Sequence, residues 1–187
     1  TNKRSWTLTI VFYILVQAAL YTAGVALPMV MASLPWGFVG KMWSSPVYLL
    51  SQDFTLSRSE EYGIRFLQRD MMRSMNVLQA FLATVLCFFL YLVLTGLILY
   101  TGNLLLGGIW GLAIAFVVHV GGLGMRFLGQ IRFALMGYAS PGNFADAGGI
   151  HLVRPVAVMV MLAAALVAIQ CCLIDKVDFR EQVHVHE

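Results

Sequence analysis

The chain has 187 residues, of which 60% are hydrophobic and 11% are charged, whereas soluble domains are about 25% charged. The charged residues gather outside long apolar runs, which excludes an ordinary soluble domain and predicts an all-α membrane protein with four transmembrane helices. The net charge of +3 is too small to indicate binding to nucleic acid.

The first apolar run covers residues 6–28 and is too long for the apolar region of a signal peptide. A helix crosses a bilayer with about 20 apolar residues, so this run predicts the first span. Gln17 lies near its middle. Because an amide inside hydrocarbon needs a hydrogen-bond partner, we expect the Gln17 face to point into a helix bundle.

A polar segment follows, and its second half predicts an amphipathic helix over residues 57–75. Ser57 with Glu60 three residues later is a capping box, which marks a helix start. Four arginines then fall near one stripe: Arg58, Arg65, Arg69 and Arg73. A basic amphipathic helix of this kind lies on lipid headgroups, or alternatively binds a partner protein at the membrane surface.

The second and third predicted spans, residues 76–100 and 104–125, are separated only by Thr101, Gly102 and Asn103. So short a turn predicts two antiparallel neighbours. The third span carries Gly107, Gly111, Ala115 and His119 at four-residue intervals, which places them on one helical face. Small residues on such a face allow another helix to approach closely, so we expect helix packing there.

The last predicted span covers residues 155–175, after a loop over residues 126–154 that contains several turn-forming glycines. This loop either lies at the membrane surface or re-enters the membrane. Counting lysine and arginine alone, the two predicted loops carry eight and the two termini four, which favours cytoplasmic loops. We expect an integral protein of the bacterial inner membrane.

His119 is the only basic or acidic side chain well inside a predicted span. Haem b buried between helices needs axial histidines on facing helices, and His151 is the second candidate in this chain. Arg126 marks the membrane edge near both, so the three residues could form a haem or quinone site. The alternative is a neutral His119 that is hydrogen-bonded across helices to Gln17 or a tyrosine.

The sequence shows no nucleophile–base pair, no paired carboxylates, no phosphate loop and no metal-ligand spacing, so we expect no catalytic residue and no metal site. The leading hypothesis is a non-catalytic subunit that packs with other subunits in a larger membrane complex. One alternative is a haem- or quinone-binding anchor of a respiratory-type oxidoreductase.

A third hypothesis is a transmembrane subunit of a transporter, because some permease subunits of ABC transporters also end with a span and a short charged tail. Such a subunit needs polar residues along a path through the membrane. The candidates in the predicted spans are Gln17, Gln79, Thr84, Thr95, His119 and Gln170.

Overall fold

The computed structural model describes residues 3–33, 43, 69–107, 109–146 and 149–174. Four helices in this part are long and apolar enough to cross a membrane: α1 (Lys3–Ser33), α5 (Val77–Leu106), α6 (Trp110–Phe127) and α7 (Val153–Ile174). The prediction of an all-α fold with four candidate spans is therefore confirmed. These lengths and compositions indicate a membrane-embedded protein.

The shorter elements lie between the four long helices. They are α4 (Arg69–Ser74), three 3₁₀ helices, η1 (Ile131–Phe133), η2 (Leu135–Ala139) and η3 (Pro141–Phe144), and two strands of two residues, β1 (Ala145–Asp146) and β2 (Gly149–Ile150). The strands pair antiparallel, with Ala145 opposite Ile150 and Asp146 opposite Gly149.

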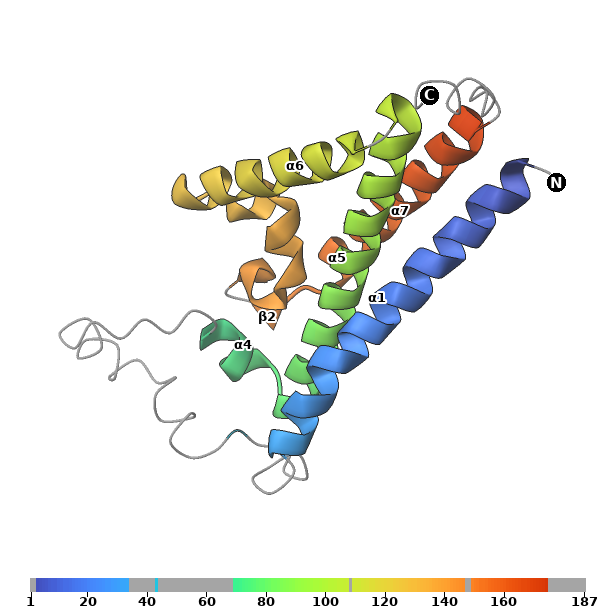
Figure 1. The fold of residues 1–187 in the computed structure, drawn as a ribbon. Coiled ribbons are helices and arrows are strands. Elements are labelled where there is room, and N and C mark those ends of the chain that lie inside the picture. The colour runs from blue at the N-terminus through green and yellow to red at the C-terminus, as the bar shows by residue number, and fades with distance from the viewer. Residues whose placement is uncertain (1–2, 34–42, 44–68, 108, 147–148, 175–187) are drawn as a thin grey trace.

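Helix α5 is the centre of the fold, because α1, α6 and α7 all pack against it (Figure 1). One core cluster joins α1 to α5 around Ala18, Val93 and Leu97. A second joins α5 to α7 around Cys87, Leu94 and Met159. Because α5 packs against three neighbouring helices, it is the most buried of the four candidate spans.

Glycine allows α1 to cross α5 closely. A Cβ atom added to Gly96 of α5 would lie 2.7 Å from Ile14 Cγ2 of α1, a separation that real Cβ atoms do not show. On either side of Ile14, α1 buries Thr7, Ala18 and Thr22. The helix continues past Pro28 to Ser33, beyond the predicted end of the first span.

The turn between the second and third spans lies later than predicted. Thr101, Gly102 and Asn103 are helical, and α5 continues to Leu106. Gly107 ends the helix with a φ of 72°, a left-handed conformation that glycine adopts readily. The Thr101 hydroxyl donates to the carbonyl oxygen of Leu97 one turn earlier, so this polar side chain is satisfied within α5.

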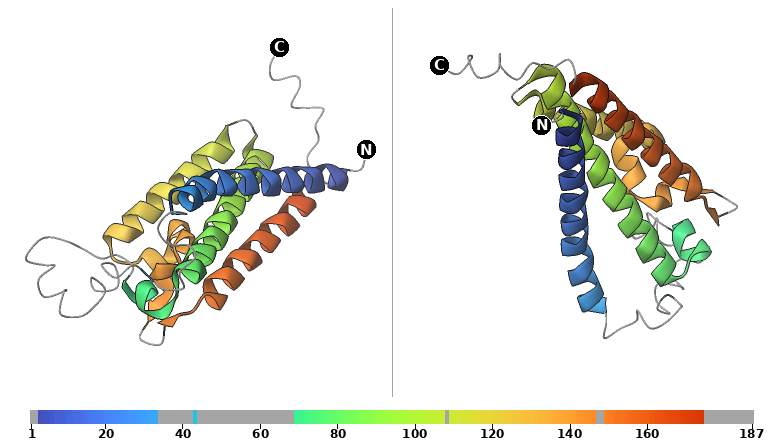
Figure 2. Two further views of the ribbon diagram at one scale, coloured as in Figure 1. Left: turned by 90° about the horizontal axis from the view of Figure 1, so that it is seen from below. Right: turned by 90° about the vertical axis from the view of Figure 1, so that its right-hand side faces the viewer.

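After this turn α6 diverges from α5 instead of lying alongside it for its full length (Figure 1). The 3₁₀ segment, especially η2, packs against both helices and fills the space between them. Gly122 of α6 lies at this contact, where an added Cβ atom would be 3.4 Å from Ala134 Cβ and from Met136 Sδ, an ordinary van der Waals distance. Figure 2 shows the same arrangement from two further directions.

The predicted amphipathic helix over residues 57–75 lies mostly outside the described residues. Its last part is present as α4, and α5 begins immediately after it at a capping box formed by Asn76 and Gln79. Trp43 joins this region, because its indole N–H donates to the carbonyl oxygen of Met75 at 2.8 Å. The interfacial helix itself stays a prediction.

Candidate functional site

His119 forms a polar contact between α5 and α6. Its Nε2 atom is hydrogen-bonded to the hydroxyl of Tyr91, which lies near the middle of α5. The two rings meet edge to face, with 5.7 Å between their centroids and 70° between their planes. A histidine bonded across helices to a tyrosine is one of the two arrangements that the sequence allowed.

The second ring nitrogen determines the form of the imidazole. Nδ1 of His119 lies 2.6 Å from the carbonyl oxygen of Ala115, one turn earlier on α6. A carbonyl oxygen can only accept, so Nδ1 carries the proton and donates. Nε2 is the atom that meets the Tyr91 hydroxyl. Both ring nitrogens are therefore used within the protein, and Nε2 is not free to bind iron.

The three residues proposed for a haem or quinone site come from two parts of the fold, His119 and Arg126 from α6 and His151 from the segment between β2 and α7. His151 is exposed just before α7, and β2, which precedes it, packs against α4 near the start of α5. His119 instead contacts the middle of α5 through Tyr91. Arg126 is exposed in the last turn of α6. In the part of the chain that the structure describes, no three His, Cys, Asp or Glu side chains are grouped to hold a metal ion.

The small residues of the third span divide between two roles. Gly111 and Ala115 are buried on α6 where it leaves α5. The backbone N–H of Gly111 donates to Asn103 Oδ1 at 2.8 Å. Gly107 does not share this face, because it caps α5 and lies outside α6. The close approach of the two helices therefore depends on Gly102 and Gly111, whose backbones meet.

Gln17 does not point into the bundle that the described residues of this chain form. Its side chain is exposed on α1, and its amide nitrogen donates to the hydroxyl of Tyr13 at 3.0 Å. Residues four apart on a helix are neighbours, so the amide obtains a partner without a second helix.

Gln170 makes the interhelical contact that the sequence assigned to Gln17. It is fully buried on α7, and its amide donates to the carbonyl oxygen of Leu97 at 3.1 Å and to Thr101 Oγ1 at 2.9 Å. These two bonds join α7 to α5. The only signal in the sequence was a single amide near the end of the last span, which did not identify its partner.

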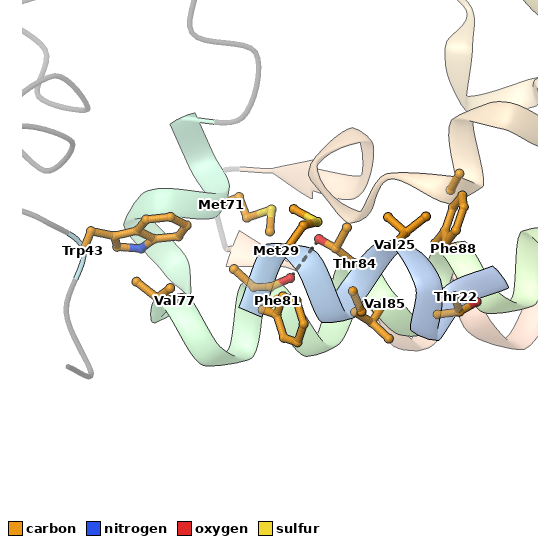
Figure 3. Close-up of a pocket in the computed structure, with 13 residues that line it drawn as sticks. Thr22, Val25, Met29, Trp43, Met71, Val77, Phe81, Thr84, Val85 and Phe88 are labelled. Carbon is orange, nitrogen blue, oxygen red and sulfur yellow. Dashed lines mark hydrogen bonds between the residues drawn. The ribbon is translucent and has the colours of Figure 1, made fainter. Parts of the chain in front are cut away.

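A cavity of about 410 Å³ lies between α1 and α5, close to α4 and η2 (Figure 3). Among the described residues its walls are almost entirely apolar, and their polar groups are the hydroxyls of Thr22 and Thr84 and the indole N–H of Trp43. The remaining lining residues include Val25, Ala26, Met29, Met71, Phe81 and Phe88. Thr84, which the sequence analysis named as a candidate for a transport path, lines this cavity, whereas His119, His151 and Arg126 do not.

The basic stripe remains untested. Arg58 and Arg65 lie outside the described residues, and Arg69 and Arg73 belong to α4.

Comparison of the chain with protein-family models, with curated proteins and with solved structures found no match. A function can therefore be inferred only from the geometry of the molecule itself.

Proposed function

We propose that this chain is a non-catalytic integral subunit of a larger membrane complex, and that a helix of another subunit packs on the outer face of α6. The observation that carries the proposal is a pair of helical glycines, Gly121 and Gly124, that packing within the chain does not explain. Both lie on α6, the helix that diverges from the rest of the fold.

Three other glycines within the long helices, Gly96, Gly102 and Gly111, have a clear reason inside the chain. A Cβ atom added to Gly96 would lie only 2.7 Å from Ile14 Cγ2. A Cβ atom added to Gly102 would lie 2.7 Å from the Cα atom of Gly111. At Gly111 it would lie 2.7 Å from Asn103 Cγ. These glycines are where neighbouring helices touch, so a larger residue would push the helices apart.

A Cβ atom at Gly121 or Gly124 would meet nothing within 4 Å, as is also true of Gly24 on α1. Unlike Gly24, these two glycines lie three residues apart on one helix. Glycine inside a helix costs about 0.5–1 kcal/mol relative to alanine, so such a residue needs a compensating contact. The two glycines follow Val117 at intervals of four and three residues, which puts all three on one face. The face buried against α5 and η2 contains Gly111, Ala115 and Gly122 and lies on the other side of the helix.

A partner helix supplies the missing contact. In hydrocarbon, helices associate through close van der Waals packing at small residues, because apolar side chains gain nothing by leaving lipid. Val117, Gly121 and Gly124 are all exposed in this chain. They form a shallow face into which the side chains of a neighbouring transmembrane helix can fit. The partner we infer is therefore another integral membrane protein.

The polar contacts favour this role over the two alternatives. The Nε2 atom of His119, which a haem iron would need, is engaged by Tyr91. Three residues proposed for a transport path bond within their own helices: Gln17 to Tyr13, Thr84 to Ala80 and Thr95 to Tyr91. These side chains are satisfied locally, as structural polar groups in a span are.

The test is the mass of the particle extracted from the native membrane in a mild detergent. We expect the wild-type chain to migrate as a complex with at least one other polypeptide. Gly124→Leu fills the outer face of α6 and should release the chain from that complex. Leu123→Phe is the matched control, because Leu123 is an exposed neighbour on a different face of α6, and it should leave the particle intact. A wild-type chain that is extracted alone, or equal behaviour of the two variants, would overturn the proposal.

A further inference from the structure

The cavity between α1 and α5 results from how these helices cross. They touch at Ile14 and Gly96, and beyond this point the C-terminal half of α1 separates from the N-terminal half of α5 (Figure 2, right). The cavity lies in the space that opens. Its walls are Thr22, Val25, Ala26 and Met29 on α1 and Val77, Ala80, Phe81, Thr84, Val85 and Phe88 on α5. Both sets recur at three- and four-residue intervals, so each helix turns one face to the cavity.

The walls offer hydrocarbon surface, because the hydroxyl groups of the two threonines already donate hydrogen bonds within their own helices. The Thr22 hydroxyl donates to the carbonyl oxygen of Ala18 at 2.7 Å, and the Thr84 hydroxyl donates to that of Ala80 at 2.8 Å. Their methyl groups and the neighbouring apolar side chains remain to contact a ligand. Polar ligands would lose hydrogen bonds on entering such a space, and apolar cavities do not retain water.

The cavity is accessible from the hydrocarbon of the bilayer. Val25 and Met29 line it and are 51% and 57% exposed, so it opens along the flank of α1. Both helices that form it are long and apolar enough to cross a membrane. In a bilayer the surroundings of this opening are therefore lipid chains, which can enter without passing through water.

One end of the cavity has the features of the membrane interface. Trp43 and Met71 lie there (Figure 3). The Trp43 indole N–H donates to the carbonyl oxygen of Met75. Tryptophan is enriched at the level of lipid headgroups. Met71 belongs to α4, which also contains two cationic residues, Arg69 and Arg73, and one acidic residue, Asp70. An anionic headgroup would be attracted to a basic segment at this depth.

We propose that this cavity binds one acyl chain of an anionic membrane phospholipid, with the headgroup at the end formed by Trp43 and α4. The volume of about 410 Å³ lies within the range of about 300–1,000 Å³ that is usual for ligand sites in proteins. A flexible hydrocarbon chain matches an elongated apolar space between two helices, whereas a compact polar ligand does not. This inference is independent of the proposed role in a complex, because it concerns a different surface.

The first test measures lipid that the purified protein retains. The chain is reconstituted in vesicles of phosphatidylglycerol and phosphatidylcholine, extracted into detergent, washed and weighed by native mass spectrometry. We expect one phosphatidylglycerol molecule per chain. Ala26→Phe fills the cavity from its α1 wall and should lower the retained fraction by roughly tenfold. Ala23→Phe, on an exposed position of the same helix outside the lining, should retain lipid as the wild type does.

A second measurement places the lipid without relying on a filled cavity. In a variant that keeps Trp43 and carries phenylalanine in place of Trp6, Trp36 and Trp110, the fluorescence comes from Trp43 alone. Vesicles then contain phosphatidylglycerol brominated in the upper part of its chain, because bromine quenches a nearby indole. Quenching that persists after extraction and washing supports a chain held beside Trp43.

Three results would overturn the proposal. One is a wild-type protein that retains no lipid, and another is an Ala26→Phe variant that retains as much as Ala23→Phe. The third is a Trp43 signal that recovers fully on washing. If no lipid is retained and Ala26→Phe instead makes residues 34–68 more sensitive to protease, the occupant is part of this chain and the lipid proposal fails.

Discussion

Replacing Gly111 by alanine should separate α5 from α6 and destabilise the fold. A Cβ atom at Gly111 would lie 2.7 Å from Asn103 Cγ and closer still to the carbonyl oxygen of Leu99. The second contact is with backbone, which cannot rotate away as a side chain can. The helices must therefore move apart, and the hydrogen bond from the Gly111 N–H to Asn103 Oδ1 would be strained or lost.

The expected magnitude follows from these two contacts. Inserting a methyl group into a tightly packed interface costs about 1–3 kcal/mol. Losing the hydrogen bond adds about 0.5–1.5 kcal/mol. Alanine is the better helix former by about 1 kcal/mol, which offsets part of the loss. The net destabilisation should therefore be about 0.5–3.5 kcal/mol.

The assay is equilibrium unfolding in mixed micelles, followed by the fluorescence of Trp110 at the start of α6 in a background that carries phenylalanine at positions 6, 36 and 43. Gly121→Ala is the matched control, because it is the same substitution on the same helix with nothing within 4 Å of the added Cβ atom. It should leave stability unchanged or raise it by about 0.5–1 kcal/mol. If Gly111→Ala were as stable as Gly121→Ala, the close contact between α5 and α6 would not exist as described.

Three further predictions concern polar groups. In a double-mutant cycle of unfolding, Tyr91→Phe and His119→Leu should show a coupling free energy of about 0.6 kcal/mol, and at most about 1.7 kcal/mol, the range of interhelical hydrogen bonds in membranes. Purely additive effects would argue against the hydrogen bond between the two side chains. Gln170→Met should lower the free energy of unfolding by about 1–2 kcal/mol, because it removes two bonds from α7 to α5; unfolding identical to that of the wild type would show that these bonds contribute nothing. Asn76→Ala should cost about 1 kcal/mol through loss of the helix cap, visible as faster hydrogen exchange in the first turn of α5, with unchanged exchange as the contrary result.

The sequence could predict the four candidate spans because the length of an apolar run directly reflects the thickness of the bilayer. It could not locate the turn after α5. Thr101, Gly102 and Asn103 resemble a turn by composition, yet the Thr101 hydroxyl bonds to its own helix and the Asn103 side chain bonds to Gly111. The helix ends instead where Gly107 adopts a positive φ, and composition does not distinguish that glycine from Gly102.

The polar residues show the same limit at the level of single side chains. A mid-span amide needs a partner, but the sequence does not say whether that partner is on the same helix. Gln17 finds Tyr13 one turn away, whereas Gln170 reaches across to Leu97. The cavity was also beyond prediction, because it depends on the angle at which α1 and α5 cross after Ile14.

The most direct test of the proposed subunit role is site-specific photo-crosslinking from the outer face of α6 in the native membrane. A photoreactive phenylalanine analogue at Val117, which is 68% exposed, should give a discrete adduct with a second membrane polypeptide. The same probe at Leu123, exposed on another face of α6, should give lipid adducts or a much weaker protein band. Lipid adducts alone at both positions would contradict the account, because the outer face of α6 would then face the bilayer and not a partner helix.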